Sequence, residues 1–251
     1  MTTPKPDIVQ EARRIIAAAA GRDITLRLLG GLAVRLHSPS ADHRSLNRTY
    51  PDIDFATPRS HGQRVERLFA DLGYTADKTF NTLNGAERMI FYDHANERQI
   101  DIFVGSFAMC HRLPIAERMS LDPLTLPLAE LFLTKLQIVE LNEKDVRDLF
   151  ALLLDHPIGS GDEETTNAWR IGRLCARDWG LYKTVSLNIE RLRQLAPAYQ
   201  FAPAERALLI ERLAELRAAI DREPKGLRWR LRASVGERVR WYELPEEVRR
   251  V

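Results

Sequence analysis

Apolar and acidic residues alternate in residues 50–55, YPDIDF, and this alternation predicts a strand with two unlike faces. Successive side chains of a strand point to opposite faces of the sheet. Ile53 and Phe55 therefore share an apolar face. Asp52 and Asp54 share the opposite, acidic face.

The same alternation recurs in residues 99–105, QIDIFVG, where an acidic side chain lies opposite an apolar face formed by Ile100, Ile102 and Val104. If the two strands pair, Asp101 joins the two earlier aspartates above a sheet whose other face is core. Carboxylates this close repel one another unless cations neutralise them. Hard oxygen ligands suit Mg²⁺, so the pattern predicts a magnesium site.

A further apolar run, ITLRLLGG, ends in Gly30 and Gly31. Alternation over residues 24–28 predicts a strand, and residues 32–37 follow as a short helix. A strand that enters a helix through glycines presents backbone N–H groups at the positive end of the helix dipole, where phosphate binds. By itself, however, a Gly-Gly pair is more typical of a simple turn.

The other periodic segments of this half predict mainly helices. Residues 38–50 are polar and predict a loop, and prolines make residues 106–127 irregular. Helical spacing is found over 7–20, 60–72, 128–141 and 143–154, and the pattern of a β-hairpin over 88–93 with 98–104.

Lys135 lies within the apolar stripe of the helix expected over residues 128–141. The opposite, solvent-facing side of that helix is expected to consist of three polar residues, Glu130, Thr134 and Gln137. A lysine is rarely buried unless it is paired, so an anion should meet Lys135. That anion is either a ligand phosphate, which we favour, or a carboxylate such as Asp145 or Asp148. The alternative is a lysine that snorkels at the edge of the core.

The composition of residues 157–164, PIGSGDEE, is typical of a linker and predicts a domain boundary. We therefore expect one domain over residues 1–156 and a second, mainly helical domain over 157–251, with helices near 165–179, 182–195 and 203–221. The first 155 residues hold 19 basic and 21 acidic side chains, whereas the rest hold 18 and 14. The second half therefore suits an anionic partner.

Residues 222–241 combine seven basic residues with Trp229 and Trp241. This mixture predicts either an RNA contact, in which the rings stack on bases, or a segment that buries its tryptophans and leaves its arginines outside. No apolar run approaches the ~20 residues of a membrane span. The N-terminal residues lack the apolar core of a secretory signal, and the two cysteines lack the spacing of metal ligands, so we expect a cytoplasmic protein that does not contact membranes.

Taken together, these motifs resemble the nucleotidyltransferase superfamily of the DNA polymerase β type. Its pattern is a Gly-Gly or Gly-Ser turn, here Gly30-Gly31, then a D-x-D strand, here Asp52 and Asp54, and a third acid, here Asp101. The resemblance covers about residues 20–155. It implies an α+β fold, in which a small mixed sheet flanked by helices precedes the helical C-terminal domain.

Two further segments are similar to one branch of that superfamily. Residues 48–54, RTYPDID, resemble its R-x-T-x-D-x-D variants. Lys135-Leu136 and residues 144–149, KDVRDL, resemble the K-L and R-D-x-x-D motifs of the AbiEii branch. That branch includes toxins of toxin–antitoxin and phage-defence systems, and some relatives add nucleotides to the acceptor end of tRNA.

The resemblance implies a role for each site residue. Two Mg²⁺ ions would be held by Asp52, Asp54 and Asp101 and would bind a nucleoside triphosphate such as ATP. The two glycines would donate N–H groups to the phosphates, which Lys135 and Arg48 would neutralise. An acceptor hydroxyl, activated with the help of the third acid, would attack the α-phosphorus and release pyrophosphate.

Three functions follow as alternatives. The first is transfer of a nucleotide to RNA, particularly tRNA, by a toxin with an antitoxin partner. The second is the same transferase chemistry on a small molecule, as in the antibiotic nucleotidyltransferases. The third is a non-catalytic nucleotide-binding protein that keeps the fold, against which the presence of all three acids argues.

Overall fold

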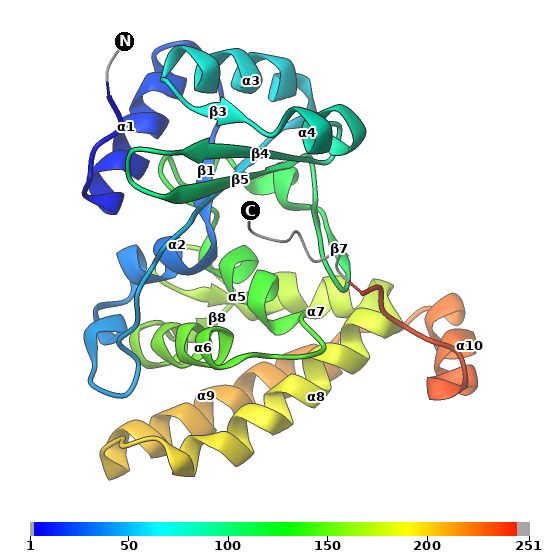
Figure 1. Cartoon of the computed structure of the whole chain (residues 1–251). Helices are drawn as coiled ribbons and strands as arrows, with labels where there is room; N and C mark the ends of the chain where they lie inside the picture. The colour runs from blue at the N-terminus through cyan, green and yellow to red at the C-terminus, as the bar shows by residue number, and fades with distance from the viewer. Residues whose placement is uncertain (1–2, 245–251) are drawn as a thin grey trace. The chain divides into compact units, whose positions relative to one another are not determined.

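The structure is a computed structural model that describes residues 3–244. It is a mixed α+β protein with one small five-stranded sheet and helices around it (Figure 1). This confirms the expected α+β class. The chain forms two compact units, which we describe separately.

The first unit comprises residues 1–36, 48–107 and 113–127 and contains the sheet. The order of the strands is β1-β2-β5-β4-β3, in which β2 and β5 are parallel and all other neighbours are antiparallel. The strands have the bounds β1 Arg27–Leu29, β2 Ile53–Thr57, β3 Thr75–Ala76, β4 Arg88–Asp93 and β5 Arg98–Val104. The helices of this unit are α1 Ile8–Ala20, α2 Gly30–His37, α3 Gly62–Asp71 and α4 Lys78–Asn84.

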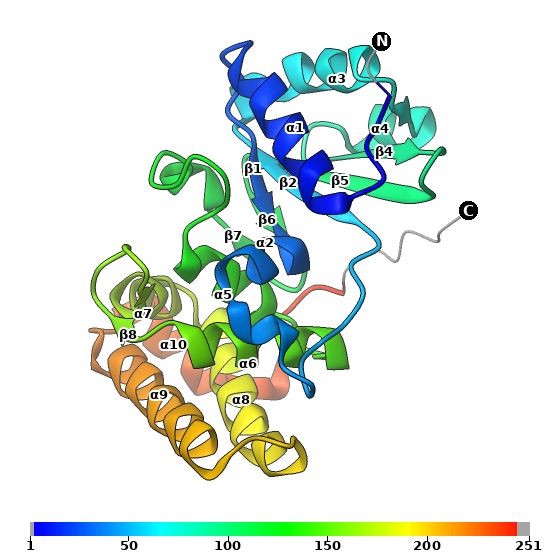
Figure 2. The same cartoon turned by 90° about the vertical axis from the view of Figure 1, so that its left-hand side faces the viewer.

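Helices α1 and α3 contact each other and cover the apolar face of the sheet (Figure 2). The fully buried ring of Phe69 on α3 packs against Phe55 of β2 and Phe91 of β4, with ring centroids 6.2 and 4.8 Å apart. At the start of α1, the Asp7 carboxylate accepts a hydrogen bond from the Gln10 N–H and caps the helix. The rings of this core lie on one side of the sheet, but Ala56, Ile90 and Phe103, which alternate onto the side of Asp54 and Asp101, are buried as well.

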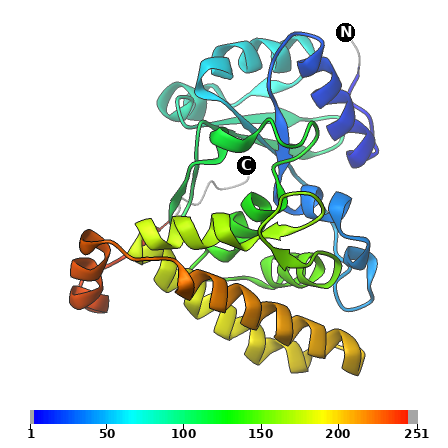
Figure 3. The ribbon, with the colours of Figure 1, turned by 180° about the vertical axis from the view of Figure 1, so that it is seen from behind.

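The second unit comprises residues 37–47, 108–112 and 128–251 and is mainly helical in its described part. Helices α8 and α9 lie side by side along it (Figure 3). In residues 3–244, no helix combines the length and the apolar character that crossing a membrane requires. The helices of the second unit are α5 Leu128–Leu136, α6 Glu143–Asp155, α7 Ala168–Arg177, α8 Trp179–Leu195, α9 Pro203–Arg222 and α10 Leu227–Val235. The short strand pairs are β6 Phe107–Ala108 with β7 Arg112–Leu113, and β8 Ile158–Gly159 with β9 Thr166–Asn167.

The polar side of the helix over 128–141 is buried, contrary to expectation. Glu130, Thr134 and Gln137 are 2%, 2% and 0% exposed. Glu130 accepts a hydrogen bond from Arg170 at 3.0 Å, and Gln137 accepts one from the His111 N–H at 2.6 Å. Helical periodicity could not reveal that a second layer of helices, which supplies its own polar partners, covers this side. The helix also ends earlier than expected, at Leu136.

The division into units differs from the boundary that we expected between residues 156 and 157. Helix α5 contacts α7 and α8, and α6 contacts α9, so both helices belong to the second unit. Within the segment that has linker composition, Ile158 pairs with Thr166 in a short parallel bridge of two strands. Glycine and acidic residues there form a short connection inside the unit.

Candidate functional site

The centre of the candidate site is the pair of parallel strands β2 and β5. Asp54 is the register partner of Asp101, and Ile53 is the partner of Ile100. Both isoleucines are fully buried on the core side. Residues in register on neighbouring strands lie about 4.8 Å apart across the sheet. The two aspartates therefore emerge side by side on the face of the sheet that lies opposite the core.

Gly30 packs directly against Asp54, one member of this acidic pair. It begins α2 immediately after β1, with φ of +71°, a conformation that residues with a side chain rarely adopt. A Cβ at this position would lie 2.0 Å from Asp54 Oδ2. Only glycine therefore allows the start of α2 to approach the carboxylate this closely. The N–H groups of the first turn of a helix have no intrahelical partners, so this approach suits the binding of an anion.

Both oxygens of Asp101 accept hydrogen bonds. Arg88 on β4 donates to Oδ1 from Nε at 2.8 Å and forms an ion pair with it at 2.6 Å. Gln99 Nε2 donates to Oδ2 at 2.7 Å. The guanidinium also lies over the ring of Phe103, with Cζ 5.2 Å from the centroid. Arg88 and Gln99 are functional candidates that belong to none of the sequence motifs, although both alternate onto the face of Asp101.

The donor atoms at this face fit a hard cation. Gln99 Oε1 is buried and has no hydrogen-bond partner in the described part of the chain. This amide oxygen belongs to the side chain that donates to Asp101, and oxygen donors of this kind suit Mg²⁺. Among residues 3–244, however, no three His, Cys, Asp or Glu side chains are grouped closely enough to hold a metal ion. Convergence of all three aspartates, including the half-buried Asp52 just before β2, stays a prediction.

Two arginines approach the tyrosine that precedes the D-x-D strand. The Cζ atoms of Arg48 and Arg35 lie 4.2 and 5.3 Å from the centroid of the Tyr50 ring. Arg35 lies on α2, the helix that Gly30 begins. Arg48 was expected to bind phosphate, and its cation–π contact fixes it near the start of that strand. Arg35 was missed because its partner lies in the polar loop region, where the pattern gives no direction.

Lys135 belongs to the second unit and is held by two carboxylates. Its Nζ lies 2.8 Å from Asp145 Oδ1 and 3.2 Å from Asp148 Oδ2. The lysine side chain is 14% exposed, and those of the carboxylates are 6% and 2% exposed. The expected anion is thus a carboxylate pair of this protein. A contact between Lys135 and a ligand phosphate stays a prediction.

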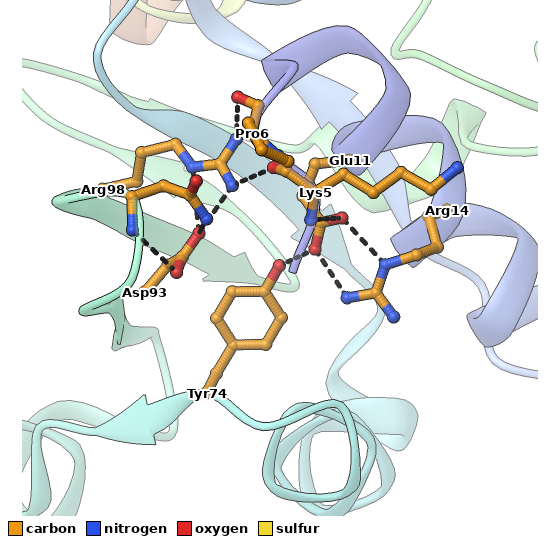
Figure 4. A network of polar contacts seen from close by, with 8 residues as sticks. Lys5, Pro6, Glu11, Arg14, Tyr74, Asp93 and Arg98 are labelled. Carbon is orange, nitrogen blue, oxygen red and sulfur yellow. Dashed lines mark hydrogen bonds and ion pairs between the residues drawn. The ribbon is translucent and has the colours of Figure 1, made fainter. Parts of the chain in front are cut away.

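A second polar network lies in the first unit and fastens α1 (Figure 4). The fully buried Glu11 carboxylate accepts hydrogen bonds from Arg14 Nε at 2.8 Å, from the Lys5 N–H at 2.9 Å and from the Tyr74 hydroxyl. Burial raises the pKa of Glu11, but the hydrogen bonds from Arg14, Tyr74 and Lys5 outweigh it, and the pKa is lowered. Burial and the contact with Glu11 raise the pKa of Tyr74. The buried carboxylate of Glu11 is paired with Arg14, which is typical of a structural role.

Comparisons with known proteins add no further assignment. No family model matches the chain, and no curated protein sequence matches it. The case for a function therefore rests on the residues and geometry described above.

Proposed function

We propose that this protein is a Mg²⁺-dependent nucleotidyltransferase with a fold of the nucleotidyltransferase type. The proposal rests mainly on one observation, the register of Asp54 with Asp101 beside the positive-φ Gly30. An acidic pair next to the N–H groups at the start of a helix provides two complementary subsites. One holds cations and the other holds phosphate oxygens.

Mg²⁺, when bound, would neutralise the triphosphate and favour ionisation of an acceptor hydroxyl. Asp54 and Asp101 would hold it, together with Asp52. The backbone at Gly30 and Gly31 would orient the phosphates. In the transfer, the hydroxyl oxygen bonds to the α-phosphorus as its proton passes to Asp101, and the bond from the α-phosphorus to the bridging oxygen breaks to release pyrophosphate.

Arg88 has a defined place in this proposal. It occupies Asp101 Oδ1, so Asp101 can accept a proton or a cation at that oxygen only when the guanidinium moves away. The side chain of Arg88 is 23% exposed and can reach solvent. We infer that the released guanidinium binds a phosphate oxygen of the substrate, for which a planar guanidinium is well suited.

We propose RNA, in particular tRNA, as the acceptor, with an antitoxin protein as a further partner. The net positive charge of the second half supports an anionic partner. The tryptophans do not add support, because both indoles are hydrogen-bonded within the protein: Trp229 to Cys175 O at 2.9 Å, and Trp241 to Thr184 Oγ1 at 3.1 Å. This arrangement matches the alternative in which the rings pack inward.

The test is incubation of the protein with each α-labelled nucleoside triphosphate, Mg²⁺ and total RNA, followed by separation of labelled RNA and of released pyrophosphate. We expect label on RNA with at least one nucleotide, and none when Mg²⁺ is chelated. Pyrophosphate released without labelled RNA would instead favour a small-molecule acceptor. Absence of both products under all conditions would contradict the transferase proposal.

One observation favours a second candidate, a non-catalytic nucleotide-binding protein. Both oxygens of Asp101 already have donors, so this carboxylate is satisfied without a metal ion. Such a protein would bind nucleotides through the start of α2 and would release no pyrophosphate. Thermal shifts separate the two candidates, because a ligand at 100 times its Kd adds about 2.7 kcal/mol to the stability of the folded state. Stabilisation by a nucleotide equally with and without Mg²⁺ would favour the second candidate.

A further inference from the structure

Helix α10 is held firmly by its inner side. Trp229 donates its indole N–H to Cys175 O, and its ring packs edge-to-face on Tyr182. The Arg232 guanidinium lies over the Trp179 ring, 4.4 Å from its centroid, and donates to Gly236 O at 2.7 Å. Just before the helix, Lys225 Nζ donates to Ile220 O at 2.6 Å. Because contacts fix the helix on this side, α10 cannot roll to bury its other side.

The outer side of α10 is apolar at its centre. Leu227, Leu231 and Val235 follow one another at intervals of four residues and are 74%, 59% and 39% exposed. Residues four apart lie on one side of a helix, and these three span about 12 Å along it. Figures 1 and 3 show α10 at the end of the α8 and α9 pair. No residue of α10 is buried, so this stripe is a surface feature over its whole length.

Arginines flank the stripe. Arg228 and Arg230 are exposed, and neither has an ion pair within the described residues. Residues 227–235, LRWRLRASV, contain no acidic side chain. A stripe of aliphatic residues between unpaired arginines is complementary to an apolar stripe between carboxylates.

We propose that the outer side of α10 docks an acidic amphipathic helix of a partner protein. The aliphatic stripe would pack against leucine-type residues of the partner, while Arg228 and Arg230 pair with its glutamates or aspartates. Arginine next to a buried apolar contact is characteristic of interface hot spots. Helix α10 belongs to the second unit, whereas the acidic residues of the sheet belong to the first. This proposal therefore does not depend on the proposed catalytic function.

Two other anionic partners fit less well. RNA is recognised through stacking on exposed rings, but the ring of α10 faces inward and the outward side chains are aliphatic. A bilayer surface binds helices with a large apolar face that carries Trp or Phe, whereas this helix of nine residues offers three aliphatic side chains. A protein helix needs only this short stripe, together with the charges beside it.

The test uses the full chain and two labelled synthetic peptides of about 18 residues. Both peptides carry leucines at helical spacing, flanked by glutamates in one and by lysines in the other. Fluorescence anisotropy should show that the glutamate peptide binds about tenfold more tightly or better than the lysine peptide. The double variant Leu227→Gln/Leu231→Gln should lose at least about tenfold of that affinity, and Arg228→Glu/Arg230→Glu should reverse the preference for charge.

The matched control is Leu187→Gln, which replaces a leucine on α8 that is 48% exposed, and it should bind like the unchanged chain. Equal binding of both peptides, or undiminished binding by the leucine variants, would overturn the proposal. So would the absence of binding to the glutamate peptide. Three other results would also overturn it: binding to phosphatidylserine vesicles, binding to an RNA oligonucleotide, or self-association of the chain. Each would do so if the same α10 variants abolished that binding and the glutamate peptide did not compete with it.

Discussion

Two clusters in which acidic side chains meet a cation, one from each unit, are built in opposite ways. In the first, one carboxylate, Asp101, is shared by Arg88 and the neutral Gln99. In the second, one cation, Lys135, is shared by Asp145 and Asp148. The Arg88 side chain is 23% exposed, whereas Lys135 is 14% exposed.

The difference shows which cluster can open. Moving Arg88 aside leaves a single carboxylate, itself 7% exposed, that keeps a hydrogen bond from Gln99. Moving Lys135 aside leaves two nearly buried carboxylates without their shared cation. The first cluster is therefore suited to exchange its cation for a ligand. The second is suited to hold α5 and α6 together.

The largest expected effect is on Lys135→Met. The change leaves Asp145 and Asp148 buried without a cation, and breaking a buried ion pair in this way costs about 3–5 kcal/mol. We expect the melting temperature to fall by roughly 6–15 °C in calorimetry. The control is Lys144→Met, which removes an exposed lysine two residues after Asn142, the N-cap of α6. If the variant melts like the unchanged chain, Lys135 is not a structural cation, and the role in phosphate binding that the sequence predicts is favoured.

The next effect concerns Asp54→Asn. If the proposed transfer takes place, loss of this charge should lower its rate by about 10²–10³-fold, the range for a group that stabilises developing charge. The readout is labelled product per minute, with Asp71→Asn, an exposed ion-pair aspartate, as the control. A normal rate would exclude Asp54 from the chemistry.

A smaller effect is expected for Arg88→Gln. Removing the guanidinium that competes for Asp101 should raise the affinity for Mn²⁺, used as a probe for Mg²⁺, by about tenfold, or ~1.4 kcal/mol. Titration calorimetry measures this without any turnover. Arg59→Gln, which removes an exposed arginine paired with Glu87, is the control. Unchanged or weaker binding of Mn²⁺ would mean that Arg88 does not compete with a cation.

The smallest expected effect is a dependence on pH that arises from Glu11. Its folded-state pKa lies below the ordinary value of 4.5 because its hydrogen bonds outweigh burial. The carboxylate therefore contributes stability that is present above pH 4.5 and is lost as the pH falls through the lower folded-state pKa. The urea concentration at the midpoint of unfolding should be higher for the unchanged chain than for Glu11→Gln at neutral pH. The two midpoints should converge in acid. A constant difference would show that the charge of Glu11 does not contribute.

Period-two alternation predicted which residues of β2 share a face, whereas the role of these residues as a site stays a prediction. Ile53, Phe55 and Asp54 lie where that rule places them. It could not predict Arg88 as the partner of Asp101, because the contact is diagonal across two strands and depends on register. The burial of Gln137 could not be predicted either, because a helix that is covered on all sides has no solvent-exposed face. The exposure of the outward leucines of α10 could not be predicted for the opposite reason. Periodicity predicts that they are buried, but no neighbouring element covers them.

The order of the sheet has a consequence for synthesis of the chain. β5 is the last of the five strands to be made, yet it lies between β2 and β4. Until residues 98–104 leave the ribosome, β2 and β4 each keep an open edge, and open edges are sites of mispairing between chains. A ribosome that pauses when β4 has left the exit tunnel but β5 has not thus exposes two open edges at once. Chaperone binding to arrested chains should peak at that length and drop once β5 has emerged.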